Sequence, residues 1–135
     1  MVLDLLLDRD PFAESASGLF SRVEAGEIVG CLCATTVTTI HYLASKAVGA
    51  KQAHLAIREL LSICEVAPVD RMALEAALTS GLADFEDAVL HEAARQAGAD
   101  AIVTRDPADF KRASLPVYSP RELQQALALG AARDK

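Results

Sequence analysis

The apolar and polar positions of this chain follow two periodicities that alternate from one end to the other. Four short apolar runs bounded by turn residues are typical of buried strands: 27–34, 64–69, 100–104 and 115–119. Between them, other segments carry apolar positions three or four residues apart, as amphipathic helices do: 11–25, 35–63, 70–80, 85–97 and 120–130. The pattern therefore predicts strands and helices in regular alternation.

Residues that start or end helices support these boundaries. Pro11 suits a first helical position, and Ser119 with Pro120 is a second such start. Asp70 and Asp84 are expected to cap the helices that follow them. Gly49 interrupts the long helical stretch and predicts two helices there.

Strands separated by helices indicate a parallel sheet between two helical layers. We therefore expect an α/β fold of the three-layer α/β/α type. With 135 residues, 52% of them hydrophobic, the chain suits one domain that spans residues 1–135. The expected sheet and core residues are Cys31, Val66, Ile102 and Val117, with Leu19, Leu43, Leu60, Leu78, Val89 and Ala93.

Composition and charge narrow the classes of function. A formal net charge of −6 argues against a general polyanion-coating surface, but not against a small acidic pocket that needs a metal. The three cysteines form no CxxC pair, which disfavours a zinc knuckle or a disulfide framework. No apolar run approaches the roughly 20 residues of a membrane span. We expect a cytoplasmic protein without a membrane partner.

Four aspartates fall where a parallel α/β sheet places its chemistry, at the carboxyl ends of the strands. Asp106 follows the apolar run at 101–103, and Asp109 lies three residues further on. Asp84 and Asp87 lie at the start of one helix, on one face, near the positive end of its dipole. Carboxylate oxygens suit Mg²⁺ or Mn²⁺ better than zinc.

Structural roles compete with this interpretation for several residues. Asp84 is a favoured N-cap type, and Asp109 could cap a short turn after Pro107. His91 is one turn beyond Asp87, but a single helical histidine is more often a packing residue, so it is left out of the site. Arg105 could face phosphate or solvent equally well.

Taken together, several stretches resemble a PIN domain of the bacterial VapC-like toxin branch. The second half carries "DFEDA", "ADAIVTRDPADF" and "LPVYSP", and the first half carries "LDLLLDRDPF" and "ATTVTTIHYLASKA" in matching order. The resemblance implies a ribonuclease that uses Mg²⁺ or Mn²⁺, is commonly a homodimer and is often neutralised by an antitoxin protein.

The resemblance also implies roles for particular residues. Asp87 would be the third acid of the family and Asp106 the fourth, with Asp84 and Asp109 as supporting acids. Thr104 would be the hydroxyl next to the fourth acid. Apart from the resemblance, the net charge of −6 predicts that RNA contact is local, through cations near the strand ends: Arg105, Lys111, Arg112 and Lys46.

Two departures from the family pattern concern the first half of the chain. The first strand and its terminal Asp are missing, because in the best register Met1 follows that strand and Asp4 aligns with a later acid. Thr39 stands where the family usually has its second acid, a Glu. We expect either that the natural chain starts several residues earlier or that a segment of a second copy fills the gap.

Three functions remain open at the level of sequence. The first is VapC-like, metal-dependent RNA cleavage. The second is a catalytically impaired PIN module that binds RNA or an antitoxin without cutting. The third is a phospho-receiver domain, which the sequence disfavours because "LPVYSPRE" offers no Lys directly after the last strand.

Overall fold

The structure is a computed structural model that describes residues 12–133. The expected helix start at Pro11, and the expectations for Met1 and Asp4, lie outside these residues. The described elements are α2 (Phe12–Glu24), β1 (Cys31–Cys33), α3 (Ala34–Val48), α4 (Ala50–Ile63), β2 (Glu65–Ala67), α5 (Arg71–Leu78), α6 (Phe85–Gln96), β3 (Ile102–Val103), η1 (Pro107–Phe110), β4 (Val117–Tyr118) and α7 (Pro120–Arg133).

Local sequence signals explain most helix boundaries. Asp70 accepts a hydrogen bond from the backbone N–H of Ala73 and so caps α5. Gly49 separates α3 from α4 with a φ of 89°, a left-handed value that favours glycine. Ser119 and Glu122 bond reciprocally to each other's backbone N–H at the start of α7, which is a capping box. The expected helices are confirmed.

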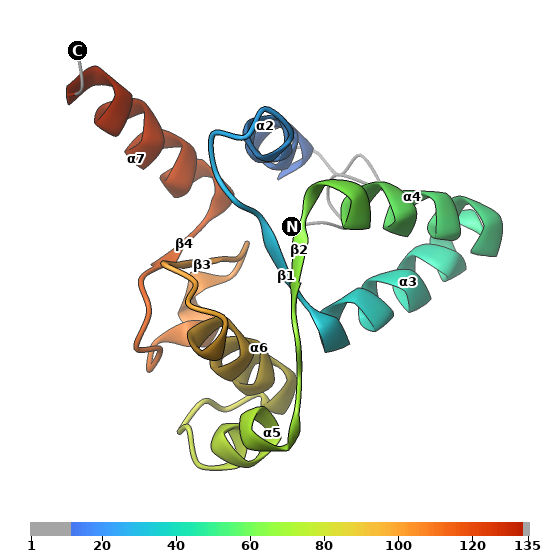
Figure 1. Cartoon of the computed structure of the whole chain (residues 1–135), viewed down its shortest axis with the longest axis vertical. Coiled ribbons are helices and arrows are strands. Elements are labelled where there is room, and N and C mark those ends of the chain that lie inside the picture. Colours follow the sequence, from blue (N-terminus) through green and yellow to red (C-terminus); the bar gives the residue numbers. More distant parts are fainter. Residues whose placement is uncertain (1–11, 134–135) are drawn as a thin grey trace.

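The strands are all parallel, which confirms an α/β fold, but the expectation of one continuous sheet is wrong for the described residues. β1 pairs with β2, and β3 pairs with β4, as two separate two-stranded sheets. Cys31 lies opposite Glu65 in the first pair, and Ile102 lies opposite Val117 in the second. Figure 1 shows the second pair beside the first, with no described strand between them.

Helices cover both faces of the β1–β2 pair (Figure 1). On one face, Cys33 and Ala67 pack with Val89 and Ala93 of α6. On the other, Leu32 packs against a cluster of Phe20, Ile40 and Leu60 from α2, α3 and α4. Neighbouring residues of a strand point to opposite faces, so the two clusters form two core layers around this pair.

The expected core is confirmed in part. Leu19, Leu60, Val89, Ala93 and Ile102 are buried. Several others are not buried: Cys31, Leu43, Val66 and Leu78 are exposed, and Val117 is half-buried. Leu78 ends α5 and Val66 lies on an edge strand, positions that apolar periodicity alone does not distinguish from core.

No helix between residues 12 and 133 is long and apolar enough to cross a membrane.

Candidate functional site

The start of α6 places two aspartates in different roles. The Oδ1 atom of Asp84 accepts a hydrogen bond of 2.9 Å from the backbone N–H of Asp87, so Asp84 is the N-cap of α6. This agrees with the structural role considered for Asp84. Asp87 lies in the first turn and is half-buried, so its carboxylate is not needed for the cap. The cap fixes the backbone from which Asp87 projects.

The segment after β3 positions the remaining acids. Thr104 donates its backbone N–H to the carbonyl of Tyr118 and accepts, at Oγ1, a 3.2 Å bond from the N–H of Asp106. Asp106 then stands at the N-cap of η1, and its carbonyl accepts a 3.0 Å bond from the N–H of Asp109. Asp109 lies inside η1 and does not cap it, so its expected capping role is wrong.

The charges of the other three aspartates act on Asp87. Its pKa is raised from 3.8 to about 6, first by burial and then by the negative charges of Asp84, Asp109, Glu86 and Asp106. The fold has therefore brought together acids from α6 and from the loop after β3. Such mutual repulsion is relieved when a cation binds among the carboxylates.

The donor chemistry suits Mg²⁺ or Mn²⁺, which prefer carboxylate and water oxygens. In the region that the structure describes, however, no group of three or more Asp, Glu, His or Cys side chains is arranged as a metal site. Asp106 is largely exposed, with a side chain 64% accessible, and its carboxylate lies 4.0 Å from Arg105. A metal bound here requires reorientation of side chains.

A large cavity opens beside these acids, between the two strand pairs. Its volume is about 830 Å³, and its lining at this end includes Asp87, Thr104, Thr36 and Thr39. Thr36 was not expected from the sequence. Its Oγ1 is buried and has no hydrogen-bond partner among the described residues. Thr39 donates to the carbonyl of Thr35 at 3.4 Å, within its own helix.

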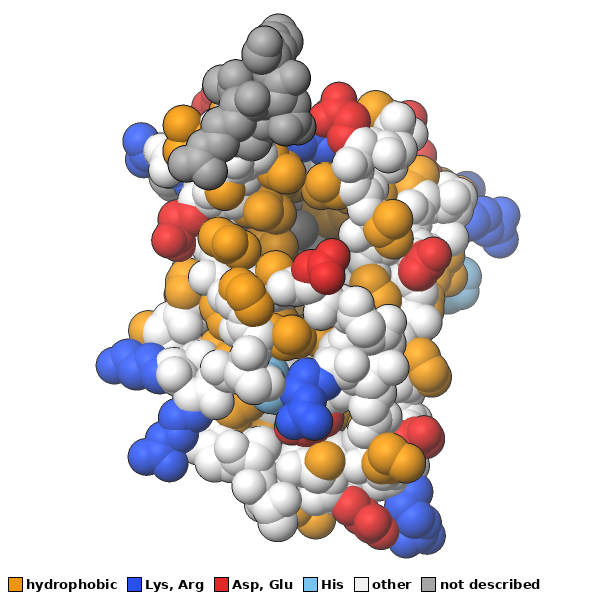
Figure 2. Space-filling view, turned by 60° about the vertical axis from the view of Figure 1, so that its left-hand side comes forward, with side chains coloured by type: hydrophobic (Ala, Val, Ile, Leu, Met, Phe, Trp, Pro, Cys, Tyr) orange, Lys and Arg blue, Asp and Glu red, His pale blue; other side chains and the backbone are white. Residues whose placement is uncertain are grey.

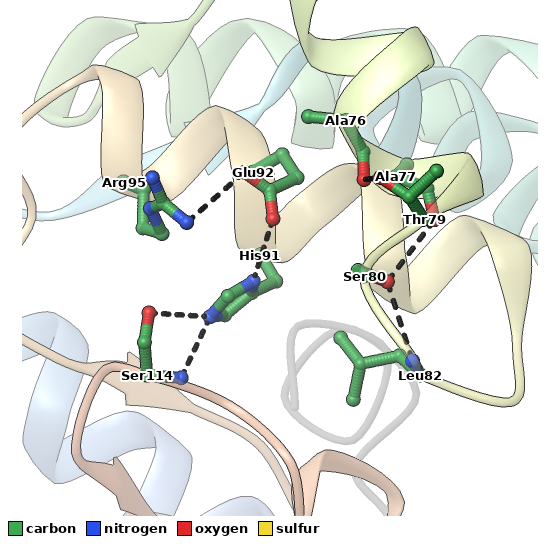
Figure 3. A network of polar contacts seen from close by, with 9 residues as sticks. All are labelled: Ala76, Ala77, Thr79, Ser80, Leu82, His91, Glu92, Arg95 and Ser114. Carbon is green, nitrogen blue, oxygen red and sulfur yellow. Dashed lines mark hydrogen bonds and ion pairs between the residues drawn. The ribbon is translucent and has the colours of Figure 1, made fainter.

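His91 has a structural role, and it holds α6 against the loop that leads to β4 (Figure 3). Its Nε2 accepts a 3.0 Å bond from the backbone N–H of Ser114, while Nδ1 lies 3.3 Å from the Glu92 carboxylate. Both side chains are buried, and Arg95 lies 3.6 Å from Glu92 on the outer side. This network holds α6 in place against that loop, and the burial of Glu92 was not predicted from the sequence.

The expected RNA-contacting cations are only partly near the acids. Arg105 lies 4.0 Å from Asp106, and Lys111 directly follows η1. Arg112 extends over Gly81, in the loop before α6. Lys46 is in the last turn of α3, twelve residues along a helix that starts at the strand ends, which is roughly 18 Å away. The expectation that Lys46 lies near the strand ends is therefore wrong.

A comparison with models of protein families identifies this architecture. The model described as "PIN domain" matches residues 1–108. The chain belongs to the PIN domain family. PIN domains are generally nucleases and generally use divalent metal ions. A comparison with curated proteins finds no match.

The PIN match includes three of the four aspartates. Asp84, Asp87 and Asp106 lie within it, together with Thr104, whereas Asp109 is one residue beyond its end. The acids at the start of α6 and after β3 are thus part of the PIN domain itself. The phospho-receiver alternative is set aside on this ground.

Proposed function

We propose that this PIN domain is a metal-dependent endoribonuclease of the VapC-like toxin type. The observation that carries the proposal is the half-buried Asp87, whose pKa is raised to about 6 by burial and by the charges of Asp84, Asp109, Glu86 and Asp106. Several carboxylates in a half-buried position suit a divalent cation and a phosphodiester. RNA as substrate, Mg²⁺ or Mn²⁺ as cofactor and an antitoxin as partner belong to the proposal.

The proposed roles follow from where each residue lies. Asp84, Asp87, Asp106 and Asp109 would hold the cation. When bound, Mg²⁺ or Mn²⁺ supplies a Lewis acid that lowers the pKa of water and stabilises charge on the phosphate. Thr104 holds the amide of Asp106 and so fixes the start of η1.

Phosphate binding would fall to the cations of the same segment. Arg105 directly precedes Asp106, and Lys111 follows the short helix that carries Asp109. Both side chains are exposed and lie close in sequence to the acids. They would hold the RNA backbone while the carboxylates act at the scissile phosphate.

Cleavage assays on matched variants test the proposal. The purified chain is incubated with single-stranded RNA and Mn²⁺, beside Asp87→Asn, Asp106→Asn and Asp100→Asn. We expect the first two substitutions to lower the rate by about 100-fold or more. Asp100 is exposed and precedes β3, at the opposite end of the strand, so its variant should retain the rate. Equal cleavage by all four proteins would mean that the activity comes from a contaminant.

A second candidate is a PIN module that binds RNA or an antitoxin without cutting. Thr39, at the position of the usual second acid, favours it because a threonine hydroxyl brings no negative charge to a metal. Calorimetric titration with Mg²⁺ separates the two functions. Binding that Asp87→Asn abolishes supports a working metal site, whereas RNA binding without Mg²⁺ binding supports the non-catalytic module.

Homodimer formation is also part of the proposal. Large apolar side chains remain exposed on α5 and at the start of α6, including Met72 (66%), Leu78 (72%) and Phe85 (50%). Exposed apolar groups of this kind are typical of surfaces that associate. Light scattering coupled to gel filtration gives the mass in solution, and a monomer at all concentrations would argue against the dimer.

A further inference from the structure

The carboxylates of the proposed metal site come from two segments that are distant in the sequence. Asp84 and Asp87 lie at the start of α6. Asp106 and Asp109 lie in the segment between β3 and β4, around η1. Like charges on the two segments repel each other, and the charges of Asp106 and Asp109 act on Asp87. A contact that holds the segments together acts against this repulsion.

Apolar packing does not by itself fix the distance between these segments. Asp87 on α6 and Thr104 at the end of β3 line the same cavity. Figure 2 shows apolar side chains gathered around a hollow on one face of the molecule. Apolar contacts are non-directional, so they allow one segment to shift against the other. A fixed spacing needs a directional contact, such as a hydrogen bond.

His91 makes such a contact, because it joins α6 to the loop after η1 (Figure 3). Its Nε2 atom accepts a 3.0 Å hydrogen bond from the backbone N–H of Ser114, and the Oγ atom of Ser114 lies 3.2 Å from the same nitrogen. His91 is about one turn beyond Asp87 on α6. The bonded residues are 23 positions apart in the chain, so the contact joins two segments.

The Ser114 side of this contact is tied to η1. The carbonyl of Phe110, the last residue of η1, accepts a 3.0 Å bond from the N–H of Ala113, which directly precedes Ser114. Phe110 is buried, so its own position is fixed by packing. Asp109 is the residue before Phe110. A shift of Ser114 relative to α6 would therefore move the backbone that carries Asp109.

The surroundings of His91 favour the tautomer that makes this bond. A backbone N–H can only donate, so Nε2 accepts and the proton of the neutral ring is on Nδ1. Nδ1 is buried and lies 3.3 Å from Oε1 of Glu92, a buried carboxylate that is 3.6 Å from Arg95. Among the described residues Nδ1 has no partner with hydrogen-bond geometry, so Glu92 acts on the ring through its charge. A negative charge on that side stabilises the proton on Nδ1 and leaves Nε2 as the acceptor.

We propose that His91 is a positioning residue for the metal site: through the Ser114 amide it sets the distance between the carboxylates at the start of α6 and those around η1. The inference rests on the proposed function, because it concerns the cation that the aspartates would hold. His91 does not itself bind the cation, since both ring nitrogens face protein groups. Groups that orient the ligands of a metal typically change its affinity by about 10- to 100-fold when they are lost.

Matched variants separate the hydrogen bond from packing. His91→Leu places an apolar side chain in the buried site and removes the acceptor. His91→Gln retains an acceptor oxygen, and Ser114→Ala removes the hydroxyl but leaves the N–H, so these two are the controls. Calorimetry gives the Mn²⁺ affinity of each protein. NMR gives the paramagnetic broadening, which falls steeply with distance from bound Mn²⁺, at the backbone amides of Asp87 and Asp109.

We expect bound Mn²⁺ to broaden both amides in the wild type and in the two controls. In His91→Leu the Mn²⁺ affinity should fall about tenfold or more. The broadening at Asp109 should also weaken relative to that at Asp87, because the two segments separate. A loss of packing alone would lower the Tm of His91→Leu without changing this ratio. His91→Phe, which keeps an aromatic ring without an acceptor, replaces His91→Leu if that variant does not fold.

The ratio of broadening decides the outcome. A ratio in His91→Leu equal to that of the wild type would overturn the inference alone and leave the proposed metal site in place. A loss of affinity in Ser114→Ala as large as in His91→Leu would also overturn it, because that variant retains the N–H. Wild-type protein that binds no Mn²⁺ would overturn the proposed metal site and this inference with it.

Discussion

Asp87 is the residue at which burial and charge repulsion act together. An isolated carboxylate near the N-terminus of a helix is stabilised as an anion by the helix dipole. Here burial and four neighbouring acids outweigh that effect and raise the pKa of Asp87 to about 6. A raised pKa means that the ionised form is costly in the folded protein. This stored repulsion is what a bound cation would relieve.

A pH-dependent stability change follows for the metal-free protein. Because the folded pKa of Asp87 exceeds its unfolded value of 3.8, the folded state binds more protons between pH 4 and 6. Stability therefore falls as the pH rises through that range and stays lower above it. After allowance for solvent screening we expect about 1 kcal/mol, so Asp87→Asn should raise the Tm at pH 7.5 by roughly 4 °C.

Thermal unfolding in EDTA at two pH values measures this effect. At pH 4 the wild-type carboxyl is mostly protonated, so the Asn variant should have nearly the wild-type Tm. Asp100→Asn is the matched control and should show no comparable gain at pH 7.5. A Tm of Asp87→Asn below wild type at both pH values would show that the carboxylate is structural.

The sequence located the acids but not their surroundings. Asp84, Asp87 and Asp106 could be predicted because they follow directly from helix starts and strand ends. The buried hydroxyl of Thr36 and the His91 network could not, since burial of a side chain depends on which helices pack together. Lys46 was expected near the strand ends. It lies far from them because α3 begins at the end of β1 and Lys46 is in the last turn of that helix.

At the scale of elements, Asp84 combines two roles that substitutions can separate. It caps α6, and its charge raises the pKa of Asp87. Asp84→Ser and Asp84→Ala remove the same charge, but only serine retains a cap. We expect the alanine variant to be about 1 kcal/mol less stable than the serine variant by urea unfolding. If Asp84 binds the metal, both variants should lose Mg²⁺ affinity. A Mg²⁺ affinity equal to that of the wild type in both variants would mean that Asp84 serves only as a cap.

Helices and strands both form where the sequence predicts them, but the strands are shorter than the apolar runs that predict them. Asp70, Asp84 and Gly49 define helix ends through their own side chains or φ preference, so the signal is local. The apolar run at 27–34 forms a strand only at Cys31–Cys33. Strand length depends on how far a neighbour extends, and β2 pairs with only these three residues.

For the whole molecule, the separation of the sheet into two pairs matters most. Each pair has its own parallel ladder, and a cavity lined by both pairs reaches from the strand edges to the acids. The position of a ligand bound at Asp87 therefore depends on what occupies the cavity. A continuous sheet would hold the β1 side and the β3 side of the site at a fixed distance, as catalysis by positioned carboxylates requires.

Charge over the whole molecule predicts how RNA binding responds to salt. With a net charge of −6, contact with phosphate has to be local. Three cations lie near the acids: Arg105, Lys111 and Arg112.

For single-stranded RNA, three phosphate contacts give a slope of about −2 in a plot of log K against log salt concentration. Fluorescence anisotropy with the Asp106→Asn variant, which we expect to bind RNA without cutting it, measures that slope. Lys111→Ala should reduce it by about 0.7, whereas Lys46→Ala should leave it unchanged. A slope steeper than about −3.5, the value for five contacts, would show that RNA is held by a wider basic surface than these three residues provide.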